Sequence, residues 1–391
     1  MTTLKACCML LTDGDWIETK DQSKSGIRLV QTGNIGNGEY LEKADRAKYI
    51  SEETFLRLGC TEVFPGDILV SRLPEPVGRA CLIPSRQERM ITAVDCSILR
   101  VDESIVSKDY LLFFLRSPHY FNQLTGKLAG TTRTRISRKN LERIEIDIPN
   151  KITQKRVVEE LSCVSAIMHA RQKQIAYMDD LIKARFVEMF GDPVVGDKIK
   201  GNKHKIGDFS SVTKLAGFEF TKYINYKESG DIIMLRGLNC KKGHLVLDDI
   251  KWIDKETSDL LPRSKLFYGD ILITYAGTIG DVAMVDADDR YHLAPNVGKI
   301  AIEDKDNYNP VYLIHLLMYS HDYIMTFASQ VAQASINMEK IRNFEYYFPP
   351  IDEQIAFASF VAQVDQSRVV VQKALDEAQL LFDSLMQKFF S

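Results

Sequence analysis

The chain has 391 residues, of which 45% are hydrophobic and 26% are charged. This composition is typical of a globular protein with two or three domains. A formal net charge of −3 argues against a nucleic-acid binder that works by bulk positive charge, so such a role would need local basic patches or a partner that supplies charge. No apolar run approaches the roughly 18 residues of a membrane span, and the seven cysteines lack metal-site or C-x-x-C spacing. We therefore expect a cytoplasmic protein with reduced thiols and no membrane contact.

The first part of the chain predicts a mixed α/β domain. Short apolar or alternating runs favour strands at 27–35, 67–73, 80–83 and 96–101. Ser51 opens a short helix that stops at Gly59, and Ser107 similarly caps a helix over 108–116. Strands and short helices of this kind indicate one compact unit that ends near Pro149.

After Pro149 the hydrophobic period becomes helical for about 40 residues, and Gly191 followed by Asp192 and Pro193 ends the helix. Two heptad rows run along it. Their members are Leu161, Met168, Ile175, Ile182 and Met189 in one row, and Val157, Val164, Arg171, Met178 and Arg185 in the other. Five heptads with this pattern predict a coiled-coil helix.

The second part of the chain repeats the first, about 200 residues later. FPGDILVSR at 64–72 returns as FYGDILITY at 267–275, and ISRKNLERIEIDIP at 136–149 returns as INMEKIRNFEYYFP at 336–349. Between them, Ala93-Val94-Asp95 corresponds to Ala294-Pro295-Asn296. Strands are expected at 270–274 and 299–302 and helices at 255–261 and 311–320, and two heptad rows follow Pro349.

The repeat predicts an α+β fold with two pseudo-repeated mixed α/β domains. Each domain is followed by a long helix, and the two helices pair as an antiparallel coiled coil because both seams are apolar and similar in length. The expected boundaries are 1–149, 150–191, 192–348 and 349–391. Each helix would be about 60 Å long at roughly 1.5 Å per residue, and the arginines in the seams would fix the register.

Motifs that carry chemistry are missing from the sequence. No phosphate-binding loop, nucleophile elbow, H-E-x-x-H motif or Gly-rich cofactor loop occurs. Asn309-Pro310-Val311-Tyr312 resembles the Asn-Pro-Pro-Tyr box of amino-methyltransferases, but its second proline is absent, and a helix start with proline at its first position explains it better. These absences argue against an enzyme that works by itself and against a cofactor bound by this chain.

The chain resembles the specificity subunits of type I restriction-modification systems. The paired GDIL strands, PPIDEQ at 349–354 and the matching IPNKITQ at 148–154 carry the resemblance, together with DGDWIETKDQ at 13–22 and SGIRLVQTGNIG at 25–36. The first helix begins with Pro-Asn-Lys-Ile-Thr-Gln where the second has Pro-Pro-Ile-Asp-Glu-Gln. The resemblance covers essentially the whole chain as two target-recognition domains, each with its helix.

This resemblance implies a subunit that is not itself an enzyme and that recognises a bipartite, asymmetric sequence in double-stranded DNA. One domain would read each half, and the coiled coil would set the distance between the halves. Two methyltransferase subunits would dock, bind S-adenosylmethionine and methylate adenine, with restriction subunits joining where the complex cleaves DNA. Base-modifying enzymes must extract their target base from the duplex, so flipping would occur in the partner's pocket.

The candidate reading surface follows the GDIL strands and precedes Ile136 and Ile336, where hydroxyl, amide and basic side chains collect. Such groups contact phosphates and base edges. The candidates for the first half-site are Arg72, Arg79, Arg133, Arg135, Arg138 and Lys139. The candidates for the second are Arg236, Lys241, Thr274, Tyr275, Thr278, Gln333, Asn337 and Lys340.

Two other interpretations remain at this point. The chain would be a protein–protein scaffold if the coiled coil were the functional part and the domains bound peptides. It would be a self-sufficient enzyme only if chemistry resided outside known motifs, and the missing cofactor and nuclease motifs argue against that.

Overall fold

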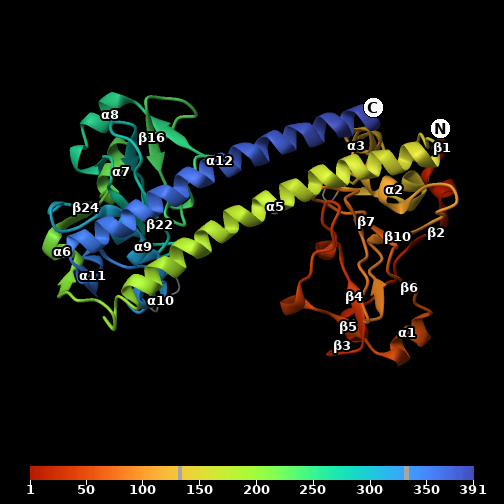
Figure 1. Ribbon diagram of the computed structural model, residues 1–391, viewed down its shortest axis with the longest axis horizontal. Coiled ribbons are helices and arrows are strands. Elements are labelled where there is room, and N and C mark those ends of the chain that lie inside the picture. Colours follow the sequence, from red (N-terminus) through yellow and green to blue (C-terminus); the bar gives the residue numbers. More distant parts are fainter. Residues whose placement is uncertain (131–133, 330–333) are drawn as a thin grey trace. The chain divides into compact units, whose positions relative to one another are not determined.

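The computed structural model describes residues 1–130, 134–329 and 334–391, and the chain divides into two compact units. Unit 1 comprises residues 1–172 and 372–391, and unit 2 comprises residues 173–371. Helix α5 (Lys151–Phe190) and helix α12 (Ile351–Phe389) each contribute one part to each unit (Figure 1). Each unit is described by itself below.

Unit 1 contains two sheets stacked on a layer of helices. One sheet has the order β2-β10-β7-β8, from Cys8–Asp13, Cys96–Val101, Ile68–Ser71 and Ala80–Leu82. The other has the order β3-β5-β4-β9-β6, from Gln22–Ser23, Tyr49–Ile50, Ile27–Val30, Met90–Thr92 and Glu62–Val63. Strands β4 and β9 are parallel, whereas their neighbours are antiparallel. In Figure 1 the first sheet lies between the long helices and the second sheet.

Short elements complete unit 1. They are α1 (Glu52–Leu58), α2 (Lys108–Phe114), α3 (Pro118–Thr125) and α4 (Arg138–Glu142), with the strand pairs β1–β13 (Thr2–Thr3 and Glu145–Ile146) and β11–β12 (Leu128–Ala129 and Arg135–Ile136). Ser51 and Ser107 cap α1 and α2 as predicted, because their hydroxyls accept from the backbone N–H groups of Thr54 and Tyr110. The strand predicted over 27–35 is shorter than expected: β4 ends at Val30, and residues 32–34 form a 3₁₀ turn.

Unit 2 repeats this plan. Its sheets have the orders β15-β24-β21-β22 (Ser210–Lys214, Val297–Ile302, Ile271–Thr274 and Val282–Met284) and β19-β16-β23-β20 (Lys251–Ile253, Ile232–Leu235, Tyr291–Leu293 and Lys265–Leu266). Strands β16 and β23 are parallel, as are β4 and β9 in unit 1. The strand pairs are β14–β25 (Lys203–Lys205 and Glu345–Tyr347) and β17–β18 (Cys240–Lys241 and His244–Leu245). The helices are α6 (Ile206–Phe209), α7 (Gly217–Tyr223), α8 (Lys255–Asp259), α9 (Pro310–Tyr319), α10 (His321–Met325) and α11 (Met338–Arg342).

The long helices run antiparallel, and each unit contains the beginning of one and the end of the other. In unit 1, Val157, Leu161 and Val164 of α5 share a core with Phe382 and Met386 of α12. The heptad rows correctly predicted these α5 positions because coiled-coil packing requires the same spacing. The two-domain, two-helix α+β fold expected from the sequence is therefore confirmed.

In unit 2 the roles of the helices are exchanged. Phe357 and Val361 of α12 pack with Ile182, Phe186 and Phe190 of α5. Phe186 and Phe190 are fully buried, although neither belongs to the predicted heptad rows. They form a second apolar stripe because the helix contacts the domain as well as the other helix: the ring of Phe186 stacks 5.6 Å from that of Tyr312 in α9.

A tight turn before β7 and β21 explains the repeated Gly-Asp pair. Gly66 and Gly269 have φ angles of +90° and +85°, which favour glycine. The carboxylates of Asp67 and Asp270 each accept a hydrogen bond at 2.9 Å, from the backbone N–H of Phe64 and Phe267 respectively. The same turn therefore starts the central strand of both units.

A buried glutamine ties the start of each long helix to the preceding domain. Gln154 Oε1 accepts from the Ser107 N–H at 2.8 Å, and Gln354 Oε1 accepts from the Asn309 N–H at 2.9 Å. Each side-chain amide also donates to the carbonyl of the proline five residues earlier, at 2.9 Å. The two helix starts differ in sequence, but their glutamines make the same contacts.

Asn309 caps α9. Its side-chain oxygen accepts from the N–H groups of Val311 and Tyr312, with Pro310 in the first turn. The helix-start interpretation of this segment is therefore confirmed. Each of the seven cysteines lies in the described part of the chain and is a free thiol. Over the described ranges, no helix combines the length and apolar character that crossing a bilayer requires.

Candidate nucleic-acid interface

Three loops lie side by side in each unit and are joined by backbone hydrogen bonds. In unit 1 the Ile136 N–H donates to the Arg72 carbonyl at 3.2 Å, and the Arg72 N–H donates to the Asp95 carbonyl at 2.9 Å. In unit 2 the Ile336 N–H donates to the Tyr275 carbonyl at 2.9 Å, and the Tyr275 N–H donates to the Asn296 carbonyl at 3.0 Å. We call this arrangement the three-loop frame.

The first two candidates of unit 1 are buried. Arg72 is 5% exposed, donates to the Val94 carbonyl at 2.6 Å and lies 3.3 Å from the carboxylate of Asp13. Arg79 is 9% exposed, and its guanidinium donates to four backbone carbonyls, those of Thr32, Ile35, Leu73 and Pro76. These contacts assign both side chains to holding loops together in this structure, which the sequence did not indicate.

The remaining candidates of unit 1 are exposed and basic. Arg135 Nη2 lies 3.4 Å from the Asp95 carboxylate, so this pair joins the segment before β10 to the segment that contains Ile136. Arg138 lies 3.6 Å from Glu142 on the same helix, and Lys139 is exposed beside it. Arg133 lies outside the described residues. Arg135, Arg138 and Lys139 therefore form a basic edge next to the frame.

In unit 2, Arg236 and Thr274 have partners within the protein. Arg236 Nη2 donates to the carbonyl and carboxylate of Asp249 at 2.8 and 2.7 Å. Thr274 is fully buried, and its hydroxyl donates to the carbonyl of Thr278. Lys241 and Thr278 are exposed.

The last candidates of unit 2 lie on or beside the frame. The Tyr275 hydroxyl oxygen accepts from the Asn296 N–H at 3.3 Å, and the ammonium of Lys214 lies 5.1 Å from the Tyr275 ring centre. Asn337 caps α11 by accepting from the Lys340 N–H at 2.8 Å, and the Lys340 ammonium donates to the Phe327 carbonyl at 2.7 Å. Gln333 lies outside the described residues.

An open cavity of about 570 Å³ brings three of the unit 2 candidates together. Arg236, Lys241 and Thr278 line it. The lining also contains residues that sequence reasoning did not select, among them Phe220, Tyr226, Leu238, Pro295 and Asn296. Asn296 was identifiable in principle, because it occupies the place of Asp95 in the repeat.

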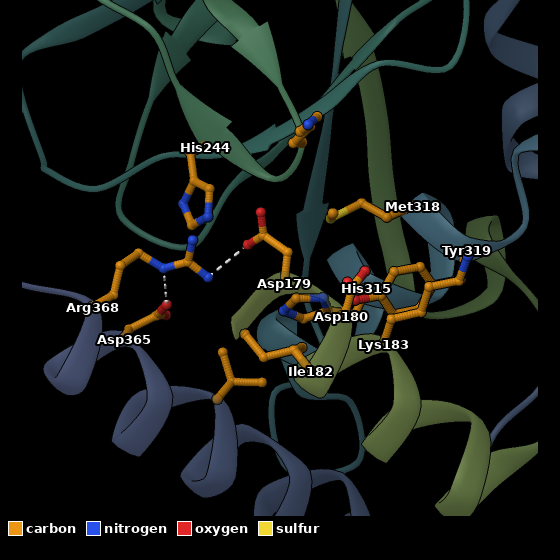
Figure 2. A pocket seen from close by; sticks show the side chains of 12 residues that line it. Asp179, Asp180, Ile182, Lys183, His244, His315, Met318, Tyr319, Asp365 and Arg368 are labelled. Atoms are coloured by element: carbon orange, nitrogen blue, oxygen red, sulfur yellow. Dashed lines mark ion pairs between the residues drawn. The ribbon is translucent and has the colours of Figure 1, made fainter. Parts of the chain in front are cut away.

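A second cavity in unit 2, of about 330 Å³, has a different character (Figure 2). Arg368 of α12 lies between Asp179 of α5, at 2.7 Å, and Asp365, at 3.4 Å. Burial, with the nearby charges of His244 and Arg368, lowers the pKa of His315 to about 4. Over the residues that the structure covers, no group of three or more His, Cys, Asp or Glu side chains could hold a metal ion. The Arg368–Asp179 pair joins the two long helices, and the Arg368–Asp365 pair lies within α12.

Comparison with known proteins identifies the repeat. The family model described as the type I restriction modification DNA specificity domain matches residues 8–177 and again residues 201–378. The chain belongs to this family. Its members recognise DNA sequence and direct their complex to it, and they are not themselves enzymes.

Individual members of the specificity family are distant in sequence. The specificity subunit of the type I restriction enzyme MjaX from Methanocaldococcus jannaschii is 20% identical over 93% of this chain and 82% of its own length. The specificity subunit of the Escherichia coli type I restriction enzyme EcoBI is 22% identical over 75% of this chain and 67% of its own length.

Two solved structures share the fold. One, from a study of complex assembly and conformational transition of the type I restriction-modification system, has a TM-score of 0.59 at 15% identity and covers all of this chain and 96% of its own. The S subunit from M. genitalium has a TM-score of 0.54 at 14% identity, again covering all of this chain and 95% of its own.

Proposed function

We propose that this chain recognises a bipartite, asymmetric sequence in double-stranded DNA, with unit 1 reading one half and unit 2 the other. The observation that supports this proposal is the three-loop frame, which has the same backbone hydrogen bonds in both units but different side chains. Two domains that read two different DNA sequences need the same backbone scaffold with different polar side chains on it.

The partners proposed for the chain are two methyltransferase subunits that methylate adenine, with restriction subunits where the complex cleaves DNA. S-adenosylmethionine would bind to the methyltransferases and not to this chain. A net charge of −3 is compatible with this division because enclosing partners can neutralise phosphates. The assembly would act in the cytoplasm, where the genome lies.

The proposed domain boundaries place the recognition domains at 1–149 and 192–348 and the spacer helices at 150–191 and 349–391. Helix α5 has 40 residues and is therefore about 60 Å long. We propose that the paired helices set the length of the unread spacer between the two half-sites.

We divide the candidate residues into direct DNA contacts, contacts at the edge of the surface, and residues that position the loops. Arg135, Arg138 and Lys139 in unit 1, and Lys241 and Thr278 in unit 2, are exposed, and we propose them as direct contacts. Arg236, Tyr275, Asn337 and Lys340 would contribute from the edge of the same surface. For Arg72, Arg79 and Thr274 we propose positioning of the loops, because these side chains are buried and donate hydrogen bonds to backbone carbonyls of the protein.

A single-molecule methylome tests the proposal. Cells carrying this gene with its methyltransferase should show methyl-adenine in both parts of a two-part motif, and deletion of this gene alone should abolish it. The Arg135→Ala variant should relax one half of the motif and leave the other intact. Failure of both halves in an assembled complex would contradict the two-domain assignment, and no gene-dependent methylation would favour the scaffold alternative.

A further inference from the structure

The turn before β10 and β24 places one residue at the same point of the three-loop frame in each unit. This residue is Asp95 in unit 1 and Asn296 in unit 2, and its carbonyl accepts the N–H of the residue that follows β7 or β21. The carbonyl contact is the same in both units. The side chain differs, and so does the local backbone, because Asn296 has a positive φ angle and Asp95 does not.

Asn296 is held firmly but its side chain is exposed. Its N–H donates to the Tyr275 hydroxyl at 3.3 Å while its carbonyl accepts from the Tyr275 N–H at 3.0 Å. Its φ angle is +69°, a left-handed conformation that asparagine tolerates better than most residues but that carries strain. The side chain borders the 570 Å³ cavity together with Arg236 and Thr278.

Asp95 takes the corresponding place in unit 1 with a charged partner. Its Oδ1 lies 3.4 Å from Arg135 Nη2, and the Arg135 side chain is about half exposed. An isolated carboxylate would repel a phosphate backbone, but this pairing neutralises it. The pair also restricts the orientation of the Arg135 guanidinium, and within the described residues only its Nη2 atom has a partner.

From these contacts we infer that position 95/296 is a specificity-determining position of both half-sites. The Asn296 carboxamide reads an adenine in the second half-site, accepting from N6 and donating to N7 in the major groove. In the first half-site Asp95 is a positioning residue that aims Arg135 at the O6 and N7 atoms of a guanine. The inference rests on the proposed function, because it names the bases that this surface reads.

A purely structural role for Asn296 makes a different prediction. If asparagine is present only because it tolerates a positive φ, glycine should replace it without loss, since glycine adopts this conformation freely. The Asn296→Gly variant therefore preserves the turn and removes the carboxamide, whereas Asn296→Asp preserves the shape and removes the donor.

The test uses the full chain assembled with its methyltransferase and a set of duplexes that differ at one base of the second half-site. For Asn296→Gly we expect preference for adenine at one position to fall by about 5–150-fold, the range of one lost bidentate contact, with the first half-site unchanged. Asp289→Gly is the matched control, because Asp289 is another exposed residue with positive φ, +52°, outside the frame. It should leave the motif unchanged.

Asp95→Asn tests the other half of the inference. We expect reduced discrimination at one guanine of the first half-site, to a degree similar to that of Arg135→Ala, and no change in the second half-site. Unaltered base preference in both Asn296→Gly and Asp95→Asn, in complexes that still methylate a two-part motif, would overturn the inference alone. A wild-type complex without sequence-dependent methylation would overturn the proposed function and this inference with it.

Discussion

The two units share their backbone contacts but differ in several polar side chains. The buried glutamines Gln154 and Gln354, the Gly-Asp turns and the three-loop frame recur with nearly equal distances. Asp95 is replaced by Asn296, and Arg72 by Tyr275. The comparison shows which contacts maintain the architecture and which positions are free to vary, and therefore where recognition can change without loss of fold.

The two units also differ beneath the surface, in where an arginine and a methionine are placed. Gly38 and Gly243 occupy the same position of the repeat, at the ends of NIGNG (34–38) and NCKKG (239–243). A Cβ atom built on Gly38 would lie 2.8 Å from Arg116 Nε, and one built on Gly243 would lie 2.8 Å from Met318 Sδ. Arg116 and Met318 therefore occupy equivalent places. Along the helices the order is reversed, because Met168 of α5 corresponds to Arg368 of α12. Unit 1 thus has its arginine (Arg116) in the domain and its methionine (Met168) on the long helix. Unit 2 has its methionine (Met318) in the domain and its arginine (Arg368) on the long helix.

The largest expected effect comes from the aromatic stripe of α5. Replacing Phe186 by alanine should lower the free energy of unfolding of unit 2 by about 3–5 kcal/mol, because a fully buried ring leaves a cavity. Met386→Ala, the equivalent change in unit 1, should cost about 2–5 kcal/mol. Urea denaturation measures both losses, and Val187→Ala, at an exposed site on the same helix, is the control.

The glutamine contacts should be of equal importance in the two units. Gln154→Ala and Gln354→Ala each leave buried backbone groups unsatisfied, so each should cost about 1–3 kcal/mol. Thermal unfolding measures the loss, with Gln379→Ala at an exposed position as the control. A large loss from one substitution and none from the other would show that the helix starts are not equivalent.

The pH dependence of stability should differ between the wild type and His315→Phe, which introduces the residue found at the corresponding position of unit 1, Phe113. The folded-state pKa of His315, about 4, lies below its ordinary value of 6.5. The folded protein therefore binds fewer protons between these values, and stability falls as pH falls through this window. Between pH 7 and pH 4, the free energy of unfolding of the variant should fall by up to about 3 kcal/mol less than that of the wild type.

Urea denaturation at several pH values measures this slope, and His169→Phe, at an exposed position of α5, is the control. A slope unchanged by His315→Phe would contradict the assignment of this pH dependence to the buried imidazole.

The smallest expected effect concerns the helix–helix ion pair. Arg368→Met copies the residue of unit 1 and removes the contact with Asp179, which is 53% exposed and stays hydrated. We expect a change within about 1 kcal/mol in urea denaturation. A loss above about 2 kcal/mol would mean that the pair stabilises unit 2 and does more than fix the register.

The sequence predicted the features that depend on local spacing. The heptads, the serine caps and the helix start at Asn309 follow from short-range rules, and the repeat aligned the two domains. The burial of Arg72 and Arg79 could not be predicted, because acceptors such as the Val94 carbonyl and the Thr32 carbonyl come from loops distant in sequence. The stripe containing Phe186 was missed because a coiled-coil pattern describes contact with one neighbour, whereas α5 has two.

The sharing of α5 and α12 between the units has a consequence for biosynthesis. Residues 1–172 of unit 1 leave the ribosome first. The core of unit 1 also includes Phe382, Met386 and Phe390, which are translated after all of unit 2. During that interval the apolar face around Leu161 lacks its native neighbour and is open to aggregation or to chaperones. Vectorial synthesis therefore completes the first domain last, and folding yield should respond to translation speed across residues 173–371.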